Sequence, residues 1–282
     1  MELIAQGMPL AFAIWVFTLG AVIGSFLNVV IARVPKGESV ARPASRCPRC
    51  KSAIRWYDNV PILSWIVLRG RCRDCALPIS PRYPMVELLV ALLAVAVARQ
   101  LGPTWTALGY FFFAAALVAL AYIDLDTWLL PQEITYPLLL LGLVSPLWNH
   151  ALLWREALIG GAAGYALFAA IALFGEKVLK RELMGWGDVW LLAGIGAWLG
   201  WQALLPVVML SALQGAVVGI VLLLLGKTPD GKKESETVED DWVPPKNAVP
   251  YGPFLALAAL EYLLAGARIV SAWDGLLQRI LG

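Results

Sequence analysis

The sequence predicts an all-α integral membrane protein with one small polar insert. Of its 282 residues, 60% are hydrophobic and only 15% are charged, and the mean hydropathy is +0.73. A soluble globular domain carries about 25% charged residues. The apolar residues gather in runs that approach the roughly 20 residues needed to cross a bilayer. All four cysteines, in contrast, lie in a single polar segment.

The apolar runs predict a bundle of about eight transmembrane helices. The first run does not read as a cleavable signal peptide, because it lacks a basic start, is too long and is followed by no small-residue cleavage site. The expected spans are 9–32, 83–100, 104–123, 134–150, 157–176, 188–204, 206–225 and 250–270.

Basic residues orient this bundle. The segment 33–82 holds 11 of the 22 Lys and Arg residues, so the positive-inside rule places it in the cytoplasm and the N-terminus outside. The connections near 177–187 and 226–249 alternate to the same side and are also basic, whereas those on the opposite side are poor in Lys and Arg. The tail with Arg268 and Arg279 is the exception. An even number of spans satisfies this alternation.

The chain divides into three segments. Residues 1–32 form the first transmembrane helix, 33–82 the cytoplasmic insert, and 83–282 the remaining bundle. The insert is rich in Pro and aromatic residues and is expected to contain turns and short strands. Within the bundle, 227–249 is polar and mixed in charge, which predicts a mobile cytoplasmic linker without chemistry of its own.

The cysteines form two C-x-x-C pairs, Cys47 with Cys50 and Cys72 with Cys75. Paired knuckles about 20 residues apart are typical of a closed tetrahedral zinc site. An insert this small has too little core to fold unaided, so a structural metal fits the physical need. Two disulfides or buried thiols are the alternatives, and a cytoplasmic position argues against disulfides. Topology already accounts for the arginines, so we expect no nucleic-acid partner.

Elimination restricts the possible chemistry. The chain has one histidine, His150, on the predicted outer side. A histidine-ligated metalloprotease and a Ser-His-Asp triad therefore cannot be built. If zinc takes every cysteine, no thiol nucleophile remains, and no glycine-rich phosphate loop followed by Lys-Ser/Thr is present. Carboxylates are the remaining candidates for catalytic groups.

Two acidic segments fall on the predicted cytoplasmic side, Asp124-Leu-Asp126 at the end of the third span and Gly185-Trp-Gly-Asp188 at the start of the sixth. Acidic residues at membrane depth are costly and mark functional sites. Two close carboxylates share a proton, so that one can activate water while the other polarises a peptide carbonyl. The alternatives are a helix-capping role for Asp188 and ordinary interfacial positions for Asp124 and Asp126.

Several motifs taken together resemble the type IV prepilin peptidases, a family of Gly-x-Gly-Asp intramembrane aspartyl proteases. They appear in the family's order and cover most of the chain outside 227–248. The matching stretches are Gly24–Pro35, the two cysteine knuckles, Ser80–Leu89, Ile123–Asp126 with Leu130–Pro131, Gly185–Asp188 and Val249–Leu255.

The resemblance implies an endopeptidase that removes the short basic leader of type IV prepilins and type II secretion pseudopilins. It also implies cleavage after a glycine, at the cytoplasmic face of the bacterial inner membrane. The implied catalytic pair is Asp124 and Asp188. Asp124 is preferred over Asp126 because it stands seven residues before Pro131. Gln132 departs from the family, which has an acid after this proline, but it lies outside the pair.

The resemblance further implies that the new N-terminal amine is methylated with S-adenosylmethionine, through the first span and the insert. Glu87 is a candidate cofactor-binding residue, with a favourable first-turn carboxylate as the alternative. Ser25 and Asn28 lie on one helix face and could serve only helix–helix contact. Glu261, near the middle of the last span, has no implied role and is expected to have a buried partner or a proton.

Overall fold

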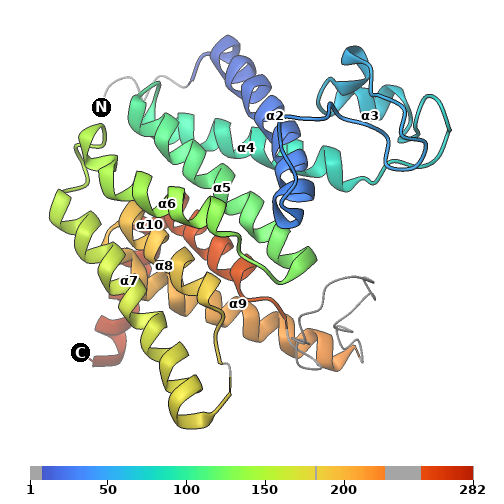
Figure 1. Ribbon diagram of the computed structural model, residues 1–282. Helices are drawn as coiled ribbons and strands as arrows, with labels where there is room; N and C mark the ends of the chain where they lie inside the picture. Colours follow the sequence, from blue (N-terminus) through green and yellow to red (C-terminus); the bar gives the residue numbers. More distant parts are fainter. Residues whose placement is uncertain (1–7, 182, 226–248, 282) are drawn as a thin grey trace.

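The computed structural model describes residues 8–181, 183–225 and 249–281, with side chains up to Gly266 in the last range. Within these residues the regular secondary structure is helical (Figure 1). The linker predicted at 227–249 lies outside the described residues, except for Val249.

Each predicted span corresponds to one helix. Five of the described helices are long and apolar enough to cross a membrane, namely α2, α4, α5, α7 and α9. The chain is therefore a multi-pass membrane protein. The bounds are α2 Leu10–Arg33, α4 Arg82–Leu101, α5 Trp105–Thr127, α6 Gln132–Val144, α7 Trp154–Phe174, α8 Trp186–Leu199, α9 Leu204–Leu224 and α10 Gly252–Leu281.

Helices α6 and α8 are shorter than the spans predicted for them. The chain leaves α6 at Val144 because Pro146 stands in the 3₁₀ turn that follows, η3 (Ser145–Leu147). Helix α8 ends before Gly200, which has a φ of 81° and leads into the turn η5 (Trp201–Ala203). Helix α8 is buried between α6 and α7, whereas α6 packs mainly against α8 and leaves Leu140 and Leu141 exposed on its outer side. The helices lie side by side in Figure 1.

Small residues let the helices approach closely. Gly160 of α7 and Gly196 of α8 touch backbone to backbone, and a Cβ atom on either would collide with the other's carbonyl oxygen. On the opposite side of the bundle, Gly20 and Gly24 of α2 lie against α4, where a Cβ on Gly24 would come within 2.7 Å of the Glu87 Cα. Such small-residue contacts are typical of membrane helix pairs.

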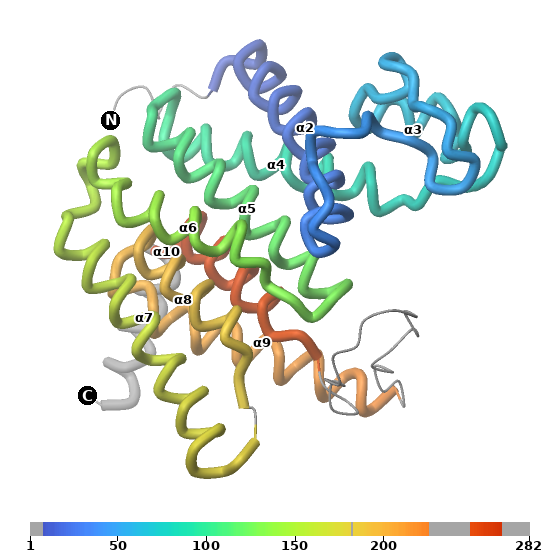
Figure 2. Tube along the Cα trace, in the orientation of Figure 1, coloured from blue at the N-terminus to red at the C-terminus, as the bar shows by residue number. Residues whose placement is uncertain are grey.

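Helices α5 and α8 form the centre of the bundle, with α10 packed against α5 and α9 (Figure 2). Because their side chains are surrounded by other helices, the ends of α5 and α8 are held in fixed positions. Their fully buried large side chains, together with one from α10, are Phe113, Leu117, Leu120, Ile123, Leu191, Leu192, Ile195 and Leu255.

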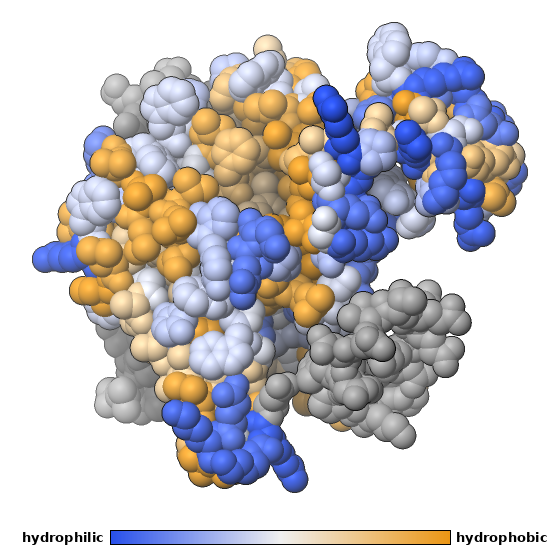
Figure 3. Space-filling view, viewed as in Figure 1, coloured by the Kyte–Doolittle hydropathy of each residue, from blue (hydrophilic) through white to orange (hydrophobic). Residues whose placement is uncertain are grey.

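The insert between α2 and α4 projects from one end of the bundle (Figure 1). It contains the 3₁₀ turns η1 (Val34–Lys36) and η2 (Trp56–Asn59) and the short helix α3 (Leu63–Val67). The expected short strands are reduced to isolated bridges, because each knuckle turn pairs only one residue on either side, such as Arg46 with Ala53. Hydrophilic side chains gather on the insert and at the far end of α7, whereas apolar surface covers the helices (Figure 3).

Candidate functional site

Asp124 lies in the last turn of α5 and is buried, with 6% of its surface exposed. Helix α5 ends just beyond it, where Trp128 adopts a left-handed conformation and donates its backbone N–H to the Asp124 carbonyl oxygen. The carboxylate oxygen Oδ2 of Asp124 accepts a hydrogen bond of 3.0 Å from the backbone N–H of Gly252, the first residue of α10. The end of α5 and the beginning of α10 therefore meet at this carboxylate.

Asp188 lies in the first turn of α8, where its backbone N–H donates to the Gly185 carbonyl oxygen. The N-cap residue Gly185 makes no side-chain hydrogen bond, and Asp188 stands in the first turn, where the helix dipole favours a carboxylate. Its Oδ1 atom is buried and has no hydrogen-bond partner among the residues that the structure describes. Asp124 lies near enough to Asp188 to act on it electrostatically, so the two acids are neighbours in the fold.

Leu130 holds the starts of α8 and α10 beside the acids. A Cβ atom on Gly187 would come within 2.7 Å of the Leu130 Cβ, and one on Gly252 within 3.4 Å of the Leu130 Cδ1. The same Cβ on Gly252 would come within 2.6 Å of Asp124 Oδ2. The glycines at these positions are therefore required by close approach.

Sequence reasoning gave no role to three residues that complete this site. They are Gly252, whose N–H binds Asp124, and Tyr251 and Ser211, whose hydroxyl groups share a hydrogen bond of 2.5 Å. Tyr251 also interacts electrostatically with Asp188. The Val249–Leu255 motif pointed to Tyr251 and Gly252, and Ser211 is a fully buried polar residue in the mostly apolar α9.

Asp126 points to a different partner from Asp124. Its carboxylate forms an ion pair of 2.7 Å with Arg82, the first residue of α4. The Arg82 guanidinium also lies 4.8 Å from the centre of the Tyr122 ring. The start of α4 is thereby attached to the last turns of α5, close to Asp124.

Glu87 lies one turn deeper in α4 than the first-turn position considered for it, because the helix begins at Arg82. Its side chain is buried, and Oε2 accepts a hydrogen bond of 2.7 Å from the backbone N–H of Ile62 in the insert. Asn28 of α2 donates to the Tyr83 carbonyl oxygen of α4, in agreement with a helix–helix contact.

Glu261 of α10 has the partner expected for it. Its Oε2 atom accepts a hydrogen bond of 2.6 Å from the side-chain amide of Gln214 in α9. The contact joins two neighbouring helices and takes up one carboxylate oxygen of this intramembrane acid.

The four cysteines converge at one point of the insert. The sulfur atoms of Cys47, Cys50, Cys72 and Cys75 all lie within 4.8 Å of one another, and those of Cys47 and Cys75 are 3.9 Å apart. A tetrahedron of thiolates around zinc, with bonds of about 2.3 Å, has sulfur atoms roughly 3.8 Å apart. The thiols are free and not joined in disulfides. The donor set therefore fits a metal ion.

The two knuckles repeat each other's backbone. Cys47 donates its N–H to the Ser52 carbonyl oxygen and Cys72 to the Leu77 carbonyl oxygen, each at 2.9 Å. The residue after the second cysteine has a positive φ in both, 60° at Lys51 and 54° at Ala76. This duplicated turn aims two sulfur atoms from each knuckle at the same point.

Hydrogen bonds prepare part of this set for metal binding. The side chain and backbone of Ser52 lower the pKa of Cys50 to about 6, and backbone bonds from Cys75 and Asp74 lower that of Cys72. At Cys75, a backbone hydrogen bond from Leu77 also lowers the pKa. Loss of hydration and the neighbouring thiols have a larger, opposite effect, and the pKa of Cys75 is raised to about 11. Thiolates are the form that binds metal, and a cation relieves their mutual repulsion.

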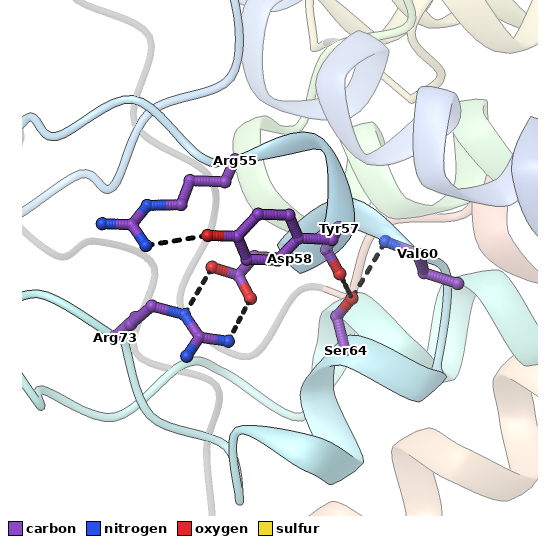
Figure 4. Close-up of polar contacts among 6 residues, drawn as sticks. All are labelled: Arg55, Tyr57, Asp58, Val60, Ser64 and Arg73. Carbon is purple, nitrogen blue, oxygen red and sulfur yellow. Dashed lines mark hydrogen bonds and ion pairs between the residues drawn. The ribbon is translucent and has the colours of Figure 1, made fainter.

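The second knuckle is fastened to η2 by a two-fold ion pair (Figure 4). The Arg73 Nε and Nη2 atoms donate to the two carboxylate oxygens of Asp58, at 2.8 and 2.6 Å. The hydrogen bond from Arg73 lowers the pKa of Asp58. Arg73 also lies over the Tyr57 ring, 5.6 Å from its centre.

Comparison with known proteins adds two family matches. Residues 18–101 match the bacterial peptidase A24 N-terminal domain, and residues 111–220 match the type IV leader peptidase family. The first range ends with α4, and the second contains both Asp124 and Asp188.

Similar curated proteins carry the name prepilin leader peptidase/N-methyltransferase. One from Myxococcus xanthus is 42% identical, over 90% of each chain. One from Aeromonas hydrophila is 41% identical, over 94% of this chain and 95% of that protein. One from Pseudomonas aeruginosa is 37% identical, over 94% of each. No solved structure matches the chain.

Proposed function

The chain belongs to the type IV leader peptidase family, and on this premise we propose that it cleaves the basic leader from type IV prepilins and type II secretion pseudopilins. After cleavage, it methylates the new N-terminal amine with S-adenosylmethionine. Its relatives' names carry both activities. The observation that supports the proteolytic step best is the meeting of Asp124 and Asp188 at one end of the bundle.

The two acids act together on water and the peptide bond. The ionised carboxylate takes a proton from water, whose oxygen attacks the scissile carbonyl carbon, while the protonated carboxyl donates a hydrogen bond to the carbonyl oxygen. The C–N bond then breaks and the leaving amine takes up a proton. The Gly252 N–H orients Asp124 through Oδ2, and the unpartnered Oδ1 of Asp188 is available to water or substrate.

The site lies where a membrane-anchored substrate can reach it. Asp124 is in the last turn of α5, Asp188 in the first turn of α8, and Gly252 begins α10. These helix ends lie on the side that also carries the basic insert, which the positive-inside rule assigns to the cytoplasm. The leader is thus cut at the cytoplasmic membrane surface, while the rest of the substrate helix stays in lipid.

Zinc is the metal proposed for Cys47, Cys50, Cys72 and Cys75, because four convergent thiolates form the donor set of closed structural zinc sites. Bound there, zinc cross-links the two knuckles. It holds the shape of the insert and takes no part in peptide cleavage.

The N-terminal helices and the insert are the proposed methyl-transfer part of the chain. S-adenosylmethionine supplies an electrophilic methyl group when bound. Glu87 binds the Ile62 N–H, so we assign it to holding the insert in place, and any effect of Glu87 on methyl transfer acts through that contact.

A cleavage assay tests the catalytic pair. The substrate is a prepilin with its leader, and the enzyme is the wild type, Asp124→Asn, Asp188→Asn or the matched control Asp126→Asn, each in liposomes. We expect both catalytic variants to lose cleavage, and the control, which loses only the Arg82 ion pair, to keep at least about a fifth of the wild-type rate. Cleavage by either catalytic variant would remove that residue from the mechanism. No cleavage by the folded wild type would leave methyl transfer as the remaining activity.

A further inference from the structure

The short helix α3 of the insert turns its apolar side outward. Leu63, Ile66 and Val67 are 60%, 59% and 75% exposed, and Trp56 of the preceding turn η2 is 83% exposed. The three helix residues follow the i, i+3, i+4 spacing of a single helix face. A helix of a soluble domain buries such a face against its own core, so this surface, here called the α3 face, lacks its usual covering.

The contacts of α3 attach this face beside the start of α4, a helix long and apolar enough to cross a membrane. The N–H of Ile62, just before α3, binds the buried carboxylate of Glu87 at 2.7 Å. Glu87 stands five residues after Arg82, the first residue of α4, and a helix rises about 1.5 Å per residue. The start of α3 is therefore attached about 7.5 Å inside the end of a membrane-spanning helix.

A second hydrogen bond also attaches α3 close to the start of α4. The Trp65 indole N–H donates to the Ile79 carbonyl oxygen at 3.1 Å, which ties the inner side of α3 to the segment that leads into α4. Helix α3 is thus held beside the membrane end of α4 by both its beginning and its middle.

The α3 face is presented rigidly. The Ser64 hydroxyl accepts from the Val60 N–H at 2.9 Å and donates to the Tyr57 carbonyl oxygen at 3.1 Å, which locks η2 to α3 (Figure 4). The Asp58–Arg73 ion pair ties η2 to the cysteine knuckle. The outward apolar side chains therefore belong to a fixed platform.

The insert that carries the α3 face has an excess of positive charge, although Arg73 and Arg82 are already paired with Asp58 and Asp126. Residues 33–82 contain 11 basic residues against three acidic ones, Glu38, Asp58 and Asp74. Clusters of Lys and Arg next to a transmembrane helix are attracted to anionic phospholipids of the cytoplasmic leaflet. Tryptophan and aliphatic side chains favour the boundary between headgroups and acyl chains.

We propose that the α3 face docks into the headgroup–acyl boundary of the cytoplasmic leaflet, with anionic phospholipid as its partner. The exposed side chains of α3 and Trp56 enter the lipid, and basic residues of the insert bind phosphate groups. This contact fixes the orientation of the cysteine insert over the membrane surface.

Site-specific crosslinking tests the proposal without relying on enzymatic activity. The zinc-loaded, full-length protein carries the photoreactive residue benzoylphenylalanine at Val67, or at Leu77 as the control, because Leu77 is an exposed apolar residue of the insert that is not part of the α3 face. The protein is placed in nanodiscs of phosphatidylcholine alone or with phosphatidylglycerol. Adducts are identified by mass spectrometry.

We expect lipid adducts to be several-fold more abundant at position 67 than at 77, and to increase with phosphatidylglycerol. The additional substitution Ile66→Glu should reduce them while zinc content stays unchanged, because the Ile66 side chain is exposed and makes no core contact. Equal yields at the two positions, or adducts with a second protein chain in place of lipid, would overturn the proposal. Yields independent of phosphatidylglycerol would overturn its electrostatic part.

Discussion

Replacing Gly252 with alanine should damage the proposed catalytic site with a single methyl group. The added Cβ atom would come within 2.6 Å of Asp124 Oδ2 and 3.4 Å of the Leu130 Cδ1. The same oxygen accepts the Gly252 N–H at 3.0 Å. The carboxylate therefore cannot move away from the methyl group without lengthening that hydrogen bond.

The expected size of the effect follows from that bond. A hydrogen bond to a charged group contributes about 1.5–3 kcal/mol. At about 1.4 kcal/mol for each factor of ten, its loss lowers kcat/KM for prepilin cleavage by about 10- to 150-fold. Helix α10 begins at Gly252 and alanine is a good helix former, so the helix itself should persist.

Gly219→Ala is the matched control, because a Cβ atom at this position of α9 meets no atom within 4 Å. It should cleave at the wild-type rate and unfold at the same or a slightly higher temperature, since alanine is favoured over glycine in a helix by up to about 1 kcal/mol. Steady-state cleavage and thermal unfolding are measured on both variants. Wild-type kcat/KM for Gly252→Ala would refute the reasoning, because Asp124 would then not depend on the start of α10.

Further tests address the contacts of the insert and of α4. Arg82→Glu should lower cleavage by up to about fivefold, as expected for a partly exposed ion pair, and adding Asp126→Arg should restore part of it; no rescue would show that the pair is not the cause. Cys72→Ser should release the bound metal and destabilise the insert, and elemental analysis showing unchanged metal would reject the four-thiolate site. Glu87→Leu should speed hydrogen exchange at the Ile62 amide while Glu87→Gln, which keeps an acceptor, should not; equal exchange in both would argue against the contact.

The number and order of the membrane helices could be predicted because hydrophobic runs report directly on transfer into lipid. Their ends were less accurate, since local turn chemistry decides them. Pro146 and Gly200 end α6 and α8 earlier than hydropathy alone suggested. Both residues are visible in the sequence, but an apolar run that continues past them hides their effect.

The closeness of Asp124 and Asp188 was predictable in outline, because topology placed both acids on one side before any site was considered. The contacts that shape the site were not predictable. Asp124 binds an N–H that lies 128 positions later in the chain, and Leu130 contacts both Gly187 and Gly252. Such contacts depend on how α5, α8 and α10 pack, which no local pattern encodes.

The cysteine site, in contrast, could be predicted from local sequence, because the C-x-x-C spacing itself brings two thiolates to one metal ion.

The nearby turn at Ile62 could not be expected from the sequence. Its φ of 63° and ψ of −52° are unfavourable for a β-branched residue, and the Leu63 N–H closes a tight γ-turn onto the Pro61 carbonyl oxygen. The hydrogen bond from the Ile62 N–H to Glu87 stabilises this strained turn. The buried Glu87 carboxylate therefore has a structural role in the insert.

Helix α4 connects the two parts of the chain more directly than its sequence suggests. Glu87 holds the insert through Ile62, and Arg82, just over one turn earlier, holds Asp126 at the end of α5. Asp126 is two residues from Asp124. A displacement of the insert would therefore pull on the same helical turns that position the catalytic carboxylate. The double variant Arg82→Glu with Asp126→Arg distinguishes this coupling from general destabilisation. Cleavage recovers in the double variant only if the contact between the two side chains is restored.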